Sequence, residues 1–407
     1  MIEVFNITCK ILTPLFMGGA EQQAELRTQS INGLLRWWFR VAGGSFEDEK
    51  RIFGWAGENS NQGSVRIFIK DFDSLQKQIF SKEFDNSGRV RQDKGINYLG
   101  FSLDQRFKEN QKDKIQREYL EKNQMFEIKV SFHPKSTQED IAKFFSSLWL
   151  AFNLGNFGSR ARRGFGSIKI ERIIENEKDI TNDCFGLSFM PSGNLGDWIK
   201  QNLEKIRQNL NSLPGQDIPY VFDNFEIYHL QKSAFNNRKD WKYKVQQGRQ
   251  GRFLKSSWGG SNINNCNNLL DFMGFLLMAY RSYRNPDYDN AKNILQRKNV
   301  NDPIFERAIF GLPLNFYFSS LKKGDSVHLK QGNETLRRAS PLIIKIIRTQ
   351  NDYEGLFIVM KSTFMPPNSK LTFSNTNVNL PSDNPWKALD NFISTLEKYN
   401  LTRRIYP

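Results

Sequence analysis

Short stretches of the chain alternate apolar with polar residues or are apolar throughout, and both patterns are typical of β-strands. In the first half, they predict strands at residues 2–12, 64–70, 125–132 and 167–174. In the second half, they predict strands at residues 225–230, 312–318, 341–348 and 355–364. Both halves of the chain are therefore expected to build sheets.

Between these strands, apolar residues recur three and four positions apart, which predicts helices. Thr137 and Asp140 have the spacing of a capping box, and they mark the start of the clearest helix. Ser30 can cap an earlier helix, which Gly43 and Gly44 end. Further helices are predicted at residues 195–210, 264–284 and 384–398.

The order of elements in the first half is strand, helix, strand, strand, helix, strand, the split β-α-β pattern of ferredoxin-like and RNA-recognition folds. We therefore expect an α+β fold of tandem ferredoxin-like (RRM-like) domains with insertions. The second domain is expected to be less regular, because no clear strand follows its last helix. The expected boundaries are 1–180 and 221–407 for the domains and 181–220 for a linker with a helix. Residues 71–124 are charged and rich in Gln and Asn, which indicates an insertion such as a hairpin or a mobile arm.

Length and charge narrow the class of protein. A chain of 407 residues favours two domains over a single core. The 58 basic and 43 acidic residues give a net charge of +15, which favours a polyanionic partner, with a solubility bias as the alternative. The three cysteines have no metal-ligand spacing and suggest a reducing compartment. Without a secretory signal or an apolar run of membrane-spanning length, we expect a cytoplasmic protein with no membrane partner.

Residues 155–166 are the most unusual stretch, with four glycines and three arginines in twelve positions. Glycine adopts backbone angles that other residues avoid, and it lets another chain come close. Such a loop can turn N–H groups toward an anion, while arginine side chains hold phosphate oxygens in pairs. Since the loop joins a helix to a strand, we expect it to hold Arg160, Arg162 and Arg163 for phosphate binding.

Two further segments have compositions that suit the same chemistry. On the first helix, Arg36 and Arg40 lie four residues apart with Trp37 between them, which suits phosphate contact and base stacking. A solvated helix face is an equal alternative. Residues 232–258 interleave eight basic with five aromatic residues, the pattern of single-stranded nucleic-acid surfaces. There the alternative is a solvated flexible loop.

The residues make no positive case for an enzyme, a metal site or a cofactor. His133, His229 and His328, the three histidines, do not cluster and have no metal-ligand spacing. Metal-free RNA cleavage usually needs a general base and acid beside the scissile phosphate, so a structural role is the simpler reading of these histidines. Asp71 and Asp73 could hold a metal, but a solvated strand end explains them more simply.

Four stretches together resemble the RAMP superfamily of CRISPR RNA-binding proteins, and within it the first subunits of type III-B (Cmr) effector complexes. They are residues 13–20, 30–40, 155–166 and 337–342. The resemblance implies tandem ferredoxin-like domains and a glycine-rich loop that contacts RNA. It also implies that CRISPR guide RNA and/or target RNA and the other Cmr subunits are the partners, and that another subunit cleaves the target.

We therefore expect a non-catalytic RNA-binding subunit of an antiviral ribonucleoprotein complex. The alternative is a metal-independent endoribonuclease of the same superfamily that processes CRISPR repeats. The candidate RNA-binding residues, taken from the patterns and from the resemblance, are Gly18, Gly19, Arg36, Trp37, Arg40, Gly155, Gly158, Ser159, Arg160, Arg162, Arg163, Gly164, Gly166, Lys242, Arg249, Arg252, Arg337 and Arg338.

Overall fold

The computed structural model of the chain combines helices with several antiparallel sheets, which confirms the expected mixture of helices and sheets. It describes residues 3–21, 23–58, 60–70, 74–91, 93–215, 218–233, 258, 260, 262–282 and 285–407. Of the candidate residues, Lys242, Arg249, Arg252, Asp71 and Asp73 lie outside these ranges.

The first sheet has the strand order β2-β5-β1-β6-β7, with antiparallel pairing throughout. Its strands are β1 (Val4–Ile11), β2 (Val65–Lys70), β5 (Met125–Phe132), β6 (Ile168–Glu175) and β7 (Lys178–Asp179). The alternation predicted from sequence is present, because every second residue of β1 and β5 is fully buried. These buried residues share a core with the helices that follow β1 and β5.

Four helices pack with this sheet: α1 (Thr28–Val41), α2 (Phe46–Phe53), α4 (Gln138–Asn153) and α5 (Leu195–Leu210). The capping box at α4 is confirmed, since Thr137 Oγ1 accepts the N–H of Asp140 (3.1 Å) and Asp140 Oδ2 accepts the N–H of Thr137 (3.3 Å). Helix α1 begins at Thr28, two residues before the expected Ser30 cap. Helix α5 has the predicted bounds, and it lies inside the first core, where Trp198 packs on Trp149.

The second large sheet has the order β12-β13-β8-β16, again antiparallel. Its strands are β8 (Phe225–Leu230), β12 (Leu342–Arg348), β13 (Tyr353–Met360) and β16 (Thr402–Tyr406). The expectation that no strand follows the last helix was wrong, because β16 pairs with β8 at the edge of the sheet. Its two adjacent exposed arginines and a register shift remove the alternation that would have revealed it.

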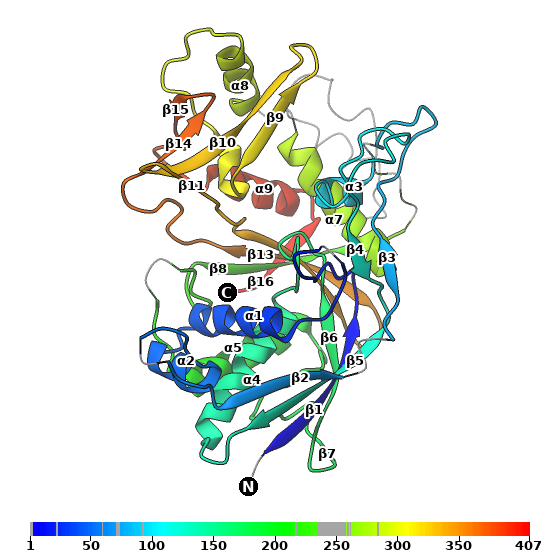
Figure 1. The fold of residues 1–407 in the computed structure, drawn as a ribbon, viewed down its shortest axis with the longest axis vertical. Helices are drawn as coiled ribbons and strands as arrows, with labels where there is room; N and C mark the ends of the chain where they lie inside the picture. The colour runs from blue at the N-terminus through cyan, green and yellow to red at the C-terminus, as the bar shows by residue number, and fades with distance from the viewer. Residues whose placement is uncertain are drawn as a thin grey trace.

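The second sheet is buried on both faces, which explains the unbroken apolar runs of β12 and β13. Ile343 and Ile358 face the core that contains α1, α4 and α5. Ile344 and Phe357 face a second core with α7 (Cys266–Arg281) and α9 (Lys387–Lys398). Figure 1 shows β8 and β16 across the middle of the molecule, with α1 on one side and α9 on the other.

A third sheet, not recognised as a unit from the sequence, covers the second core. It has the order β11-β10-β14-β15 with β9 also paired to β10, and Figure 1 shows it at the end of the molecule remote from the first sheet. Its strands and the short helices beside it are β9 (Leu314–Phe318), β10 (Lys323–Gln331), β11 (Glu334–Leu336), β14 (Ser369–Phe373), β15 (Thr376–Val378), α8 (Asp287–Leu295) and η2 (Glu306–Phe310).

The expected insertion after β2 is anchored to the second half of the chain. It contains β3 (Lys77–Ile79), α3 (Gly95–Leu99) and β4 (Glu118–Leu120), and β3 pairs with β4. Helix α3 lies against α7, where the N–H of Ile96 donates to Asp271 Oδ1 (2.7 Å). At Gly95, a Cβ atom would overlap the backbone of α7, so the two helices are in direct backbone contact. Within the described ranges, no helix is both long and apolar enough to cross a membrane.

Candidate nucleic-acid interface

The glycine-rich loop, residues 155–166, lies against the segment that follows β1. The N–H of Ser159 donates to the carbonyl of Phe16 (2.6 Å), and the N–H of Gly166 donates to that of Pro14 (2.9 Å). Thr13 Oγ1 donates to the carbonyl of Gly164 (2.8 Å). The loop therefore adjoins the segment that continues into Gly18 and Gly19, two further candidates, both partly exposed.

Two glycines of the loop are required by its backbone. Gly158 has φ +80° and Gly166 has φ +75°, and an added Cβ would overlap the carbonyl oxygens of Phe16 and Phe157, respectively. Several N–H groups that were expected to face an anion instead donate to protein carbonyls, including those of Phe157, Ser159 and Gly166. Anion binding by the loop therefore depends mainly on its side chains.

The other side of the loop is bonded to strand β12. Arg163 and Ile344 form a parallel bridge, in which the N–H of Ile344 donates to the carbonyl of Arg162 (3.3 Å). Asn156 Nδ2 donates to the carbonyl of Ile344 (2.8 Å). Gly155, the first glycine, packs its backbone against the Trp38 ring. The conformation of the loop is therefore set by both large sheets, although it follows α4 directly in sequence.

Lys345 contributes a buried amino group to the contact between the loop and β12. Its Nζ donates to the carbonyls of Phe152 and Gly155, both at 2.6 Å, at the end of α4. The residue is 1% exposed and has no ion pair among the residues that the structure describes. Burial lowers the pKa of its ammonium group to about 7.

Five arginines from three segments meet beside the loop, and we call them the arginine cluster. They are Arg160, Arg162, Arg163, Arg281 and Arg338. Arg162 lies over the Trp37 ring (5.1 Å to the centroid) and donates to the carbonyl of Ser340 (2.8 Å). Arg160 Nε donates to Ser102 Oγ (3.0 Å) in the insertion.

The positive charge of the arginine cluster is not neutralised by the described part of the chain. None of its five members forms an ion pair with a described carboxylate, and Arg163 Nη1 and Arg338 Nε are buried without a hydrogen-bond partner. Burial and the neighbouring Arg338 lower the pKa of Arg162 to about 10. Burial and the neighbouring Arg281 do the same for Arg163. Both stay charged at neutral pH, so the cluster suits an anion with several oxygens.

Arg36 and Arg40 are placed differently. Both lie beside the buried carboxylate of Glu49, with Arg36 Nε at 2.7 Å and Arg40 Nε at 3.5 Å from its two oxygens. Glu49 is only 2% exposed, so it neutralises much of this pair. Trp37, between them in sequence, is half-buried and contacts Arg162. The structure thus joins Trp37 to the arginine cluster and joins Arg36 and Arg40 to helix α2.

The remaining candidates have varied surroundings. Arg337 is exposed, and Arg338 Nη2 donates to Ser362 Oγ (2.8 Å). Of the basic residues predicted at 232–258, only Lys232 is described, and it pairs with Asp352 (2.6 Å) and Glu354 (3.4 Å). Sequence reasoning did not select Arg281 or Lys345. The sequence marks each of them only as a basic residue within a mostly apolar helix or strand.

The three histidines lie in separate places. His229 Nε2 is 2.9 Å from Glu354 Oε2, and both line an open cleft of about 630 Å³ with Arg403 and Lys200. His133 accepts the N–H of Lys135 through Nδ1 (3.2 Å), and His328 lies on β10. No group of three or more His, Cys, Asp or Glu side chains in the described ranges is arranged to hold a metal ion.

Comparison with known proteins matches the chain to one family. The family model of the RAMP superfamily matches residues 8–169. The chain is 34% identical over 179 residues to the CRISPR system Cmr subunit Cmr1-2 of Pyrococcus furiosus, which covers 40% of this chain and 93% of that protein. It is 32% identical over 215 residues to Cmr subunit Cmr1-1 of the same organism, covering 50% of this chain and 56% of that protein.

The fold is also similar to a solved structure. The crystal structure of Cmr1 from Pyrococcus furiosus, in its apo form, aligns with a TM-score of 0.53 at 18% sequence identity. The alignment covers 99% of this chain and 98% of that one, so it includes the second large sheet and the third sheet. This likeness shows the fold of the whole chain, whereas the family model covers the first part.

Proposed function

Because the chain belongs to the RAMP superfamily, in the family of the Cmr subunit Cmr1, we propose that it is a non-catalytic RNA-binding subunit of a type III-B CRISPR ribonucleoprotein. Its partners are CRISPR guide RNA and/or target RNA and the other Cmr subunits. It contacts RNA mainly through the phosphate backbone, so its own sequence preference is weak.

The observation that carries this proposal is the arginine cluster, which has no carboxylate partner among the residues that the structure describes. Half-buried guanidinium groups that repel one another destabilise the free protein, and a phosphate chain relieves that repulsion. The three buried N–H donors of Arg163, Arg281 and Arg338 that lack partners fit acceptor oxygens of a ligand. Trp37 adds an aromatic ring beside Arg162, a combination that suits single-stranded nucleic acid.

The strand orders support a second part of the proposal, that the fold consists of tandem ferredoxin-like domains. The first sheet contains the order β2-β5-β1-β6, and the second sheet has the order β12-β13-β8-β16. If the strands of each sheet are counted along the chain, both orders read second, third, first and fourth. We place the domains at residues 1–180 and 221–407. Helix α5, in the intervening segment, completes the core between the two sheets.

The experiment that tests the RNA surface measures how affinity for single-stranded RNA depends on salt. If about six phosphates are bound, the logarithm of affinity falls with the logarithm of salt with a slope near −4. Replacing Arg160 and Arg338 by Gln removes two contacts and brings the slope to about −2.5. The matched double variant Arg36→Gln/Arg40→Gln changes the slope by no more than about 0.7, because Glu49 already neutralises one of the two charges. An unchanged slope in the first variant contradicts the proposal.

One observation favours the endoribonuclease as a second candidate. The His229–Glu354 pair lies in an open cleft, and a carboxylate that orients a histidine is a common arrangement for a general base. If the chain is a repeat-processing enzyme, it cleaves a repeat RNA in EDTA, and His229→Ala abolishes that cleavage. His133→Ala serves as the control at the other histidine facing a cleft.

A further inference from the structure

The insertion after β2 exposes more apolar surface than its size explains. Nine large hydrophobic side chains in the described ranges are exposed, and four of them belong to this insertion. They are Ile79 (59%), Phe101 (47%), Phe107 (57%) and Ile115 (52%). Several exposed apolar side chains gathered in one region are typical of a binding surface.

Phe101 and Phe107 form the centre of this surface. Their ring centroids are 5.7 Å apart and their planes are inclined at 63°. Lys82 Nζ lies between the rings, 5.0 Å from the Phe101 centroid and 5.1 Å from that of Phe107. Lys82 itself is buried, so it fills the inner side of the pair and leaves the outer faces of the rings open.

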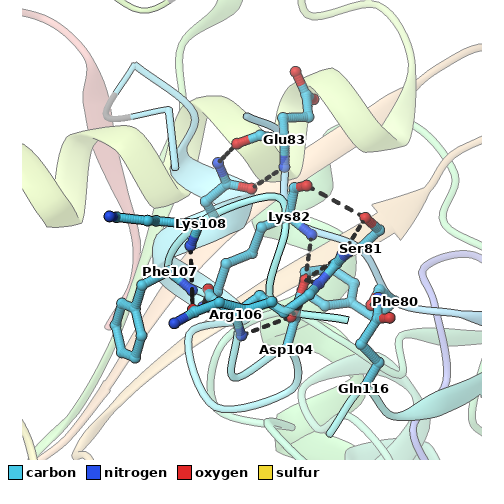
Figure 2. Close-up of polar contacts among 11 residues, drawn as sticks. Phe80, Ser81, Lys82, Glu83, Asp104, Arg106, Phe107, Lys108 and Gln116 are labelled. Carbon is cyan, nitrogen blue, oxygen red and sulfur yellow. Dashed lines mark hydrogen bonds and ion pairs between the residues drawn. The ribbon is translucent and has the colours of Figure 1, made fainter. Parts of the chain in front are cut away.

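A buried polar network holds this pair in place (Figure 2). Asp104 is fully buried and accepts the N–H of Lys82 (2.9 Å), while the Arg106 guanidinium donates to both of its oxygens. Burial alone raises the pKa of the Asp104 carboxyl, but these hydrogen bonds outweigh burial and lower it. Lys82 Nζ in turn donates to the carbonyl of Arg106 (3.0 Å). The rings are therefore presented by a rigid support, which reduces the entropy lost on binding.

Two exposed cations lie beside the pair. Arg89 and Lys108 face each other across an antiparallel bridge, both are exposed, and neither forms an ion pair with a described residue. Figure 2 shows the Phe107 and Lys108 side chains extending to the same side, away from Asp104. Cations beside open aromatic faces complement single-stranded nucleic acid better than an apolar protein surface.

The pair is also continuous with the arginine cluster. Ser102, next to Phe101, accepts hydrogen bonds from the Arg160 guanidinium. Arg117, near the end of the insertion, donates from Nη1 to Ser159 Oγ of the glycine-rich loop (2.7 Å). A nucleic-acid strand bound at Arg160 therefore reaches Phe101 directly.

We infer that Phe101 and Phe107 form a stacking site for unpaired bases of the RNA whose backbone lies on the arginine cluster. This inference rests on the proposed function, since it extends the same RNA path. Stacking on aromatic rings tolerates any base, so the site adds affinity without sequence preference. The loop arginines then bind phosphates while the insertion binds bases.

The test compares the full-length protein with the variant Phe101→Ala/Phe107→Ala, using a single-stranded RNA with 2-aminopurine at successive positions. We expect the variant to bind about tenfold more weakly with an unchanged salt slope, and to lose the fluorescence quenching that stacking causes at one or two positions. Phe46→Ala is the matched control. Phe46 is 49% exposed, pairs with Trp55 (5.0 Å) and lies under Lys50 (4.4 Å), but its helix α2 is remote from the insertion (Figure 1).

Unchanged affinity and quenching in the double variant overturn the inference. If that variant binds RNA normally but no longer copurifies with the other subunits, the surface binds protein and the inference is also overturned. The two proposals fail separately. A tenfold loss in Phe101→Ala/Phe107→Ala with no change of slope in Arg160→Gln/Arg338→Gln supports stacking and contradicts the arginine site.

Discussion

Two groups of arginines, on helix α1 and on the glycine-rich loop, look equivalent in sequence and differ in the structure. Arg36 and Arg40 lie beside Glu49, whose buried carboxylate neutralises part of their charge. Arg160 and Arg162 have hydroxyl, carbonyl and aromatic neighbours, and no described carboxylate within ion-pair distance. A basic motif therefore indicates binding capacity only when its charge is not already neutralised within the fold.

The largest expected effect comes from removing the backbone conformation that builds the loop. Gly166→Ala forces a Cβ onto the Phe157 carbonyl at φ +75°, so we expect a loss of about 2–4 kcal/mol in unfolding free energy. Gly33→Ala is the control on α1, where nothing lies within 4 Å of the added atom. A helix-interior glycine replaced by alanine should gain about 0.5–1 kcal/mol. Urea denaturation of both variants measures the contrast, and an equal response would show that the loop is not constrained.

Much of this loop's setting was predictable from local pattern. The capping box of α4 and the alternation of β6 bracket the loop, and both depend on short-range rules. Its partner β12 was predicted as a strand, but nothing in the sequence pairs Ile344 with Arg163, which are 181 positions apart. Likewise, Glu49 lies in a helix that was not predicted, so the neutralisation of Arg36 was invisible. Long-range pairing decides which charges remain available, and one sequence does not encode it in any local pattern.

The next effect depends on pH and tests the junction below the loop. Burial lowers the pKa of Lys345 from 10.5 to about 7, so between these values the unfolded chain binds more protons than the folded one. Stability conferred by this group therefore rises with pH from about 7 to 10, by up to about 1.4 kcal/mol per unit. In Lys345→Met, the free energy of unfolding measured by denaturation at pH 7, 8 and 9 should lack that rise.

The control for this pH dependence is Lys70→Met. Lys70 lies on β2, is partly exposed, and forms an ion pair with Glu127 on β5. This variant should reproduce the wild-type slope. If Lys345→Met also reproduces it, the ammonium group is not desolvated at the junction, and the bonds to Phe152 and Gly155 do not tie the loop to β12 as described.

A smaller effect should come from removing the carboxylate beside Arg36 and Arg40, so that this pair lacks an acidic partner as the loop arginines do. Glu49→Gln removes the charge that neutralises Arg36 and Arg40, at a cost of about 1–3 kcal/mol in stability. The one released charge should steepen the salt slope of RNA binding by up to about 0.7 and raise affinity two- to threefold. Glu47→Gln is the control, because that exposed carboxylate pairs, among the described residues, only with Lys50 on the same helix. An unchanged slope in Glu49→Gln would mean that position on the surface, rather than neutralisation, separates the two groups.

The last effect concerns the residue that links the two groups. Trp37 lies between Arg36 and Arg40 in sequence but under Arg162 in space. Trp37→Leu removes a cation–π contact of about 0.5–1 kcal/mol and frees the Arg162 side chain, so RNA affinity should fall two- to fivefold at constant salt slope. Trp55→Leu removes another partly exposed tryptophan, packed on Phe46 rather than on an arginine, and should leave affinity unchanged. Equal losses in the two variants would show that Trp37 supports the fold and does not orient a phosphate-binding arginine.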